Sequence, residues 1–175
     1  MPVTLTTDDF RVSLAGHVQT RGEEIRQKHG PRIGWSELQR IVEDRACVRY
    51  PCRIQFDAHP LGPGEMAHAL PLGNRPEDGF QIYVHPLLMT ELGDAVYAVL
   101  YQLVPVNYGP FASAEDAEIF GAAVLGISQE EYYQALCSIA DRLSEADPGE
   151  LAAEHAEPDH VCNCAPAIAP PSCFS

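Results

Sequence analysis

Four side chains that bind soft metal ions lie close together near the end of the chain. They are His160, Cys162, Cys164 and Cys173. The Cys-x-Cys spacing is tighter than the Cys-x₂₋₄-Cys of structural zinc sites, yet thiolates this close suit copper(I) or zinc(II), or a redox-active pair. The alternative is an unstructured tail whose thiols have no specific role. We therefore expect zinc or copper only at this tail, and no cofactor in the rest of the chain.

The remaining cysteines are predicted to be structural, and so are three histidines. A disulfide framework is not expected without a secretion signal, and buried free thiols pack as small apolar groups. This interpretation covers Cys47, Cys52 and Cys137. Histidines in or near the predicted strands could converge as metal ligands, but such residues more often have structural hydrogen bonds. They are His59, His68 and His85.

An apolar stretch at residues 90–104 predicts a buried helix that follows a strand. Pro105 is expected to end this helix, because proline lacks the amide hydrogen that a helix interior needs. The order of strand, helix and later helix resembles the zincin metallopeptidases. In that family the helix carries His-Glu-x-x-His, whose two histidines lie one turn apart and bind zinc while the glutamate acts as general base.

Placed on this sequence, the three motif positions are occupied by Tyr101, Gln102 and Pro105. Glu115 or Glu118, on the following predicted helix, would stand where the family has its third zinc ligand. A phenol, a carboxamide and a pyrrolidine ring cannot hold zinc or deprotonate water as imidazole and carboxylate do. The resemblance therefore implies a zincin-like fold without catalytic activity. The alternative is an ordinary buried helix with no relation to zincins.

The other elements follow from capping signals, Gly and Pro breaks and hydrophobic spacing. Helices are expected at residues 7–29, 35–44, 90–104, 113–125 and from 128 towards Pro148, and strands at 52–57, 65–72 and 80–85. This order indicates an α+β fold with about five helices packed against a small three-stranded sheet. We expect one globular domain over residues 1–147. Residues 148–175 are expected to form a tail that is acidic at first and then rich in Cys and Pro.

The formal net charge of −14 is unevenly distributed along the chain. Residues 1–60 hold nine of the eleven Lys and Arg residues and are nearly neutral, whereas the rest is strongly acidic. Such a surface repels phosphate backbones and anionic lipids, so neither nucleic acid nor a membrane is an expected partner. No apolar run has the length of a membrane span, and the first ten residues do not resemble a signal peptide. We expect a cytoplasmic protein.

Three hypotheses of function follow. The leading one is a non-catalytic, zincin-like domain with a groove along the third strand. It would bind an unidentified protein or peptide, for example a peptide that adds as a further strand along an exposed strand. The second is a metal- or thiol-handling protein that uses the tail. The third is an enzyme of unrecognised type that uses Glu115 and Glu118, one helical turn apart. A precursor whose tail is cleaved and released is a minor further alternative.

Overall fold

The elements of the fold appear in the order expected from the sequence. A computed structural model describes residues 7–146, with side chains from residue 11 onward. The helices and strands are α1 (Thr7–His29), α2 (Trp35–Glu43), β1 (Cys52–Phe56), β2 (Ala67–Pro71), β3 (Phe80–Val84), α3 (Leu92–Tyr108), α4 (Ala114–Leu125) and α5 (Gln129–Ala146). Short 3-10 turns are η1 (Pro76–Asp78), η2 (Pro86–Met89) and η3 (Gly109–Phe111). Five helices and a small mixed sheet confirm the predicted α+β class.

The three strands form one sheet in the order β1-β3-β2. β1 runs parallel to β3, with Cys52 beside Phe80, and β2 runs antiparallel to it, with Ala67 beside Val84. Because β3 is hydrogen-bonded on both sides, it offers no free edge to which a peptide can add. A peptide that adds as a further strand would therefore have to pair with an edge strand rather than with β3. The edges of this sheet are β1 and β2.

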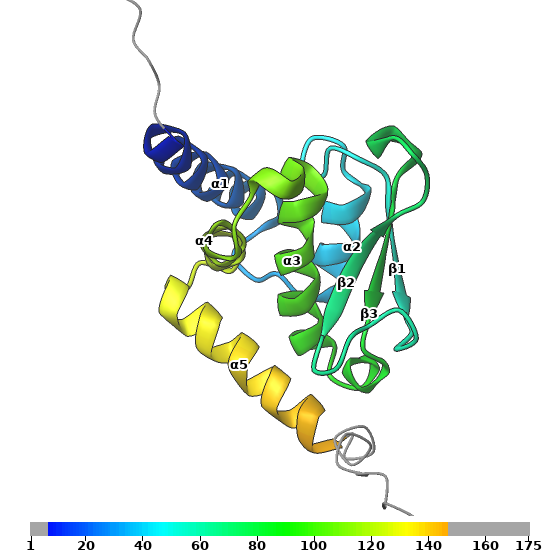
Figure 1. The fold of residues 1–175 in the computed structure, drawn as a ribbon. Coiled ribbons are helices and arrows are strands. Elements are labelled where there is room, and N and C mark those ends of the chain that lie inside the picture. Colours follow the sequence, from blue (N-terminus) through cyan, green and yellow to red (C-terminus); the bar gives the residue numbers. More distant parts are fainter. Residues whose placement is uncertain (1–6, 147–175) are drawn as a thin grey trace, which may run out of the picture.

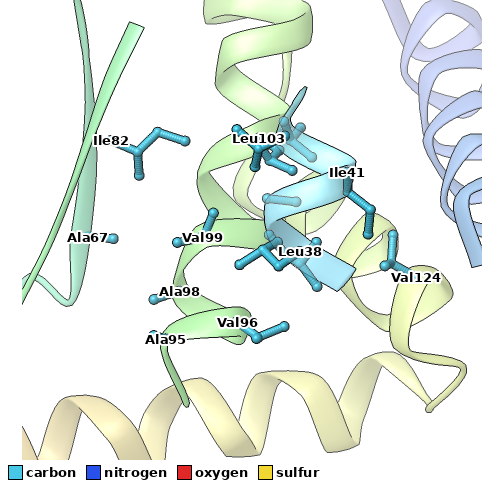
Figure 2. Packing of buried hydrophobic residues seen from close by; sticks show 14 of the residues in the cluster. Leu38, Ile41, Ala67, Ile82, Ala95, Val96, Ala98, Val99, Leu103 and Val124 are labelled. Atoms are coloured by element: carbon cyan, nitrogen blue, oxygen red, sulfur yellow. The ribbon is translucent and has the colours of Figure 1, made fainter. Parts of the chain in front are cut away.

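The apolar core is centred on α3. This helix packs against the sheet on one side and against α4 and α5 on the other, with α2 beside it and α1 packed on α4 (Figure 1). Figure 2 shows Ile82 of β3 pointing towards Val99 and Leu103 of α3. Leu38 of α2 and Val124 of α4 belong to the same cluster, and all five side chains are fully buried. Burial of each stabilises the fold by roughly 1.5–3 kcal/mol.

Local signals place the ends of α4 where the sequence predicts them. The Ser113 hydroxyl accepts from the Asp116 N–H at 3.1 Å, and the Asp116 carboxylate accepts from the Ser113 N–H at 2.8 Å. This capping box satisfies donors that the first turn leaves unpaired. Gly126 ends the helix in a left-handed conformation with φ 69°, where glycine is favoured. Among residues 7–146, no helix is both long and apolar enough to cross a membrane.

The prediction that Pro105 ends its helix is wrong, because α3 continues past this residue. Proline has no N–H, so the carbonyl of Tyr101 loses its helical donor, at a typical cost of about 3 kcal/mol. Val104 and Val106 on either side are buried, and their packing outweighs that local cost. The helix ends instead at Gly109, which has a φ of 65° and whose N–H donates to the carbonyl of Pro105.

Candidate functional site

Gln102, at the centre of the zincin-like motif positions, has a structural role. Every second residue of β2 forms backbone hydrogen bonds with β3, and Ala67 and Ala69 lie between these residues. The backbone N–H and carbonyl groups of Ala67 and Ala69 therefore point away from β3. The Gln102 carboxamide occupies that edge: its Nε2 donates to the Ala67 carbonyl at 2.9 Å, and its Oε1 accepts from the Ala69 N–H at 3.1 Å. Gln102 thus fixes α3 to β2 and covers part of the β2 edge. It cannot act as a general base, because a carboxamide does not take up a proton as a carboxylate does.

Tyr101 and Glu118 lie close together at the contact between α3 and α4. Burial raises the pKa of the Tyr101 phenol, and the nearby charge of Glu118 raises it further. The Glu118 carboxylate accepts a hydrogen bond from Nε2 of Gln129 at 3.0 Å, whereas Glu115 is exposed at the start of α4. The structure therefore brings one motif position within the electrostatic influence of one acidic residue, whose carboxylate is hydrogen-bonded to Gln129.

Pro105 faces a different region, a pocket of about 790 Å³ that we call the apolar pocket. Its walls come from α1, the segment before β1, the start of β3 and the end of α3. The apolar side chains that line it include Leu14, Tyr50, Phe80, Pro105 and Tyr108. Neither Tyr101 nor Glu118 lines this pocket, so the predicted motif positions do not converge on it.

A second pocket, of about 250 Å³, adjoins the apolar pocket, and we call it the basic pocket. The two share the lining residues His17, Arg49, Asn107 and Tyr108. Arg21 and Arg45 also line the basic pocket. Arg21 pairs with Glu24 and donates to the Ala46 carbonyl. No carboxylate in the described part of the chain forms an ion pair with Arg45 or Arg49, so both keep their positive charge available for a ligand.

Asn107 holds the segment that carries these arginines. Its Oδ1 accepts from the backbone N–H of Arg49 at 2.8 Å, and its Nδ2 donates to the Cys47 carbonyl at 3.4 Å. The Arg49 guanidinium carbon lies 5.4 Å from the centre of the Tyr50 ring, within the range of a cation–π contact. The segment before β1 is therefore fixed to the end of α3, and its arginines have a defined position beside the apolar pocket.

A compact group of three side chains lies behind the same segment. His29 is the last residue of α1, Asp44 follows the last residue of α2, and Cys47 lies one turn further on. The Cys47 sulfur is 3.2 Å from Asp44 Oδ2 and 3.6 Å from His29 Nε2, and that Nε2 is 3.4 Å from Asp44 Oδ2. Imidazole, carboxylate and thiolate are all zinc ligands, so within residues 11–146 this group is able to hold a metal ion.

The electrostatics of this group favour a carboxylate and a protonated thiol. The Lys28 ammonium and the Ala46 N–H both hydrogen-bond to the Asp44 carboxylate and hold its pKa well below the usual range. Burial, followed by the hydrogen bond and charge of Asp44, raises the pKa of the Cys47 thiol to about 11. A thiol that keeps its proton near neutral pH is a poor nucleophile, so the group does not match an activated catalytic cysteine.

The three strand histidines do not form a metal-binding group among the described residues. His59 pairs with Asp57 at 2.9 Å, His68 lies 3.6 Å from Glu65, and His85 accepts from a nearby backbone N–H. These are the local structural contacts that we expected. Cys52 and Cys137 are half-buried free thiols. The predicted tail ligands His160, Cys162, Cys164 and Cys173 lie outside the described residues.

Sequence reasoning missed both the basic pocket and the group around Cys47. The concentration of basic residues in the first 60 positions was a signal for the pocket, but not for which arginines share it. No short motif links His29 to Asp44 and Cys47, because the first comes from a different helix. No family model, curated protein or solved structure matches this chain. The geometry of these sites is therefore the basis for any functional assignment.

Proposed function

We propose that this protein is a non-catalytic binding protein whose zincin-like domain takes up an acidic segment of a partner protein. The observation that carries the proposal is the composite site at the end of α3, where the apolar pocket and the basic pocket share four lining residues. An apolar side chain of the partner fits the apolar pocket, while its neighbouring carboxylates meet Arg45 and Arg49. A concave apolar surface with a few placed charges is typical of binding sites.

Charge supports an acidic partner. The whole chain has a formal net charge of −14, so acidic residues of its own are abundant. Arg45 and Arg49 are nevertheless exposed and lack a carboxylate partner in the described part of the chain. A local positive patch on an otherwise acidic protein steers an acidic segment to this place and repels it elsewhere.

The role of Gln102 supports binding without catalysis. Its carboxamide forms two hydrogen bonds with the β2 backbone at the position where the zincins have their general base. The same two bonds occupy backbone groups that an added strand along β2 would need. The composite site is therefore a better candidate for the partner than either a hydrolytic centre or strand addition at β2.

A cytoplasmic location belongs to the same proposal. Cys47, Cys52 and Cys137 are free thiols in the described part of the chain, which suits a reducing compartment.

A labelled peptide of alternating glutamate and phenylalanine tests the proposal by fluorescence anisotropy. We expect it to bind the full-length protein, and the affinity to fall as salt is added. Replacing Arg45 and Arg49 by glutamine should weaken binding by about tenfold, since two exposed charge pairs contribute up to about 1 kcal/mol each. The matched control replaces Arg32 and Arg53, two exposed arginines outside the pockets, and should bind as the wild type does. Equal binding of a peptide with glutamine in place of glutamate would overturn the proposal.

A further inference from the structure

The end of α1 and the turn after α2 bring three different metal-binding groups to one point. We propose that His29, Asp44 and Cys47 form a zinc site, with water as the fourth ligand. This site is on neither the predicted tail nor α3, and the proposal does not depend on the binding function proposed above. It rests on the arrangement of the three ligand atoms, on their burial, and on the elements that hold them.

The separations of the ligand atoms match one face of a zinc tetrahedron. With Zn–S of roughly 2.3 Å and Zn–N or Zn–O of roughly 2.0–2.2 Å, tetrahedral ligand atoms lie about 3.3–3.6 Å from one another. The three observed separations are 3.6 Å for sulfur to nitrogen, 3.4 Å for nitrogen to oxygen and 3.2 Å for sulfur to oxygen. The three separations therefore come within a few tenths of an ångström of those in a tetrahedral zinc site.

The three side chains are held by elements of the fold. The backbone N–H groups of Cys47 and Val48 both donate to the Asp44 carbonyl at 2.8 Å, so Asp44 and Cys47 lie on one closed turn. The N–H of Gly30 donates to the Arg26 carbonyl, which closes the last turn of α1 beside His29. Ligands on rigid elements reduce the entropy that metal binding has to overcome. Cys47 is buried, and the His29 and Asp44 side chains are only 11% and 20% exposed.

The charges around the group are compatible with a divalent ion. Lys28 places its ammonium on Oδ2 of Asp44, the same oxygen that faces the other two ligands. Its side chain is 54% exposed, so it can move into solvent when a metal ion replaces its charge. On binding, the Cys47 sulfur gives its proton to solvent and bonds to zinc as a thiolate. One carboxylate and one thiolate then neutralise the two charges of the ion.

Zinc is favoured over magnesium and calcium by the mixture of ligands. Sulfur, imidazole nitrogen and carboxylate oxygen together suit a borderline ion, whereas magnesium and calcium prefer oxygen ligands alone. Three protein ligands and one water are also the arrangement of open zinc sites. We infer no hydrolytic role for this site, although Cys47 also lines the basic pocket.

The test separates this site from the tail thiols. In the full-length chain, Cys162, Cys164 and Cys173 are replaced by serine, and zinc is titrated in competition with a chromophoric chelator. We expect one zinc ion per chain with a dissociation constant of about 1 μM or tighter, a threshold weaker than the affinity of zinc-finger peptides because only three protein ligands hold the ion. In the same background, Cys47→Ser should weaken binding by about 100-fold or more, since even groups that only orient a ligand contribute 10- to 100-fold. Cys137→Ser is the matched control and should change nothing.

Cobalt substitution gives a second measurement that does not depend on the stability of the Cys47 variant. Cobalt bound to the tail-serine protein should show a thiolate-to-metal charge-transfer band and tetrahedral visible absorption. The Lys28→Met variant should bind zinc more tightly than its parent, because the competing ammonium is gone. Absence of the charge-transfer band, or zinc affinity unchanged by Cys47→Ser, would show that the three side chains form only a hydrogen-bonded cluster.

Discussion

Oε1 of Gln102 lies 3.1 Å from the backbone nitrogen of Ala69, at the free edge of β2. The other end of the same carboxamide donates to the carbonyl of Ala67. One side chain on α3 thus occupies two backbone groups that no strand reaches. In the zincin comparison this position holds the general base, and here the residue joins the central helix to the sheet. The two hydrogen bonds give Gln102 a structural role, and its carboxamide cannot act as a base.

Removing the Gln102 carboxamide should destabilise the domain without affecting any chemistry. Gln102→Leu leaves a backbone donor and acceptor unpaired in a half-buried position, which should lower the free energy of unfolding by about 1–3 kcal/mol. Gln102→Glu keeps the acceptor but loses the donor to Ala67, and should also destabilise. Urea unfolding measures both, with Gln39→Leu on the exposed face of α2 as the control. Chelator-sensitive peptidase activity in Gln102→Glu would contradict our assignment.

Gly121 should not tolerate a side chain. An alanine Cβ at this position would lie 2.1 Å from the ring of Tyr132, which is fully buried and donates its hydroxyl to the Tyr97 carbonyl at 2.7 Å. We expect Gly121→Ala to lower the free energy of unfolding by about 1–3 kcal/mol through overpacking. Gly16 is the matched control, because its Cβ would meet no atom within 4 Å, and alanine should stabilise α1 there by about 0.5–1 kcal/mol. Equal changes in the free energy of unfolding at Gly121 and Gly16 would show that the packing of α4 against α5 does not require a glycine at position 121.

Replacing Pro105 by alanine should stabilise the fold but weaken peptide binding. Pro105→Ala restores the helical hydrogen bond to Tyr101 and should raise the free energy of unfolding by about 1–3 kcal/mol. The same change removes a ring from the wall of the apolar pocket and should weaken binding of the glutamate–phenylalanine peptide. Thermal unfolding and anisotropy measured on one sample test both effects. A variant that is stabilised and binds as tightly as the wild type would exclude Pro105 from the site.

The start of α5 should contribute a pH-dependent part of the stability. The Glu131 carboxylate accepts from the N–H and hydroxyl of Ser128 at 2.8 and 2.7 Å, and these bonds lower its pKa. Because the folded-state pKa is depressed, the contribution is fully present above the ordinary glutamate pKa and is lost as the pH falls through the lower folded-state pKa. Glu131→Gln should therefore be less stable than the wild type at neutral pH, and the difference should close in acid. If the stability difference between Glu131→Gln and the wild type does not change with pH, the Glu131 carboxylate is not its source.

The sequence predicts elements better than their relations in space. Breaks such as Gly30 and Gly126 act through local backbone preference, so most helix and strand ends were predictable. Pro105 misled the prediction because the burial of its neighbours outweighs its local cost. The central place of β3 depends on pairings between distant segments, and no local pattern encodes that order.

The candidate sites show the same limit. Cys47 was predicted to be structural, and nothing in the sequence links it to His29, which lies 18 positions earlier. Arg45 and Arg49 come from one segment, but only the fold places them beside the end of α3. Residues that meet through tertiary structure alone leave no spacing in the sequence that could be recognised.

Mapping the peptide onto the protein by NMR tests the central claim most directly. On adding the glutamate–phenylalanine peptide to ¹⁵N-labelled full-length protein, we predict that the amide signals of residues 45–50 and 106–111 shift. Those of β1, β2 and α5 should stay in place. Shifts that run along the β1 edge instead, or no shifts at all at saturating peptide, would contradict a binding site at the end of α3.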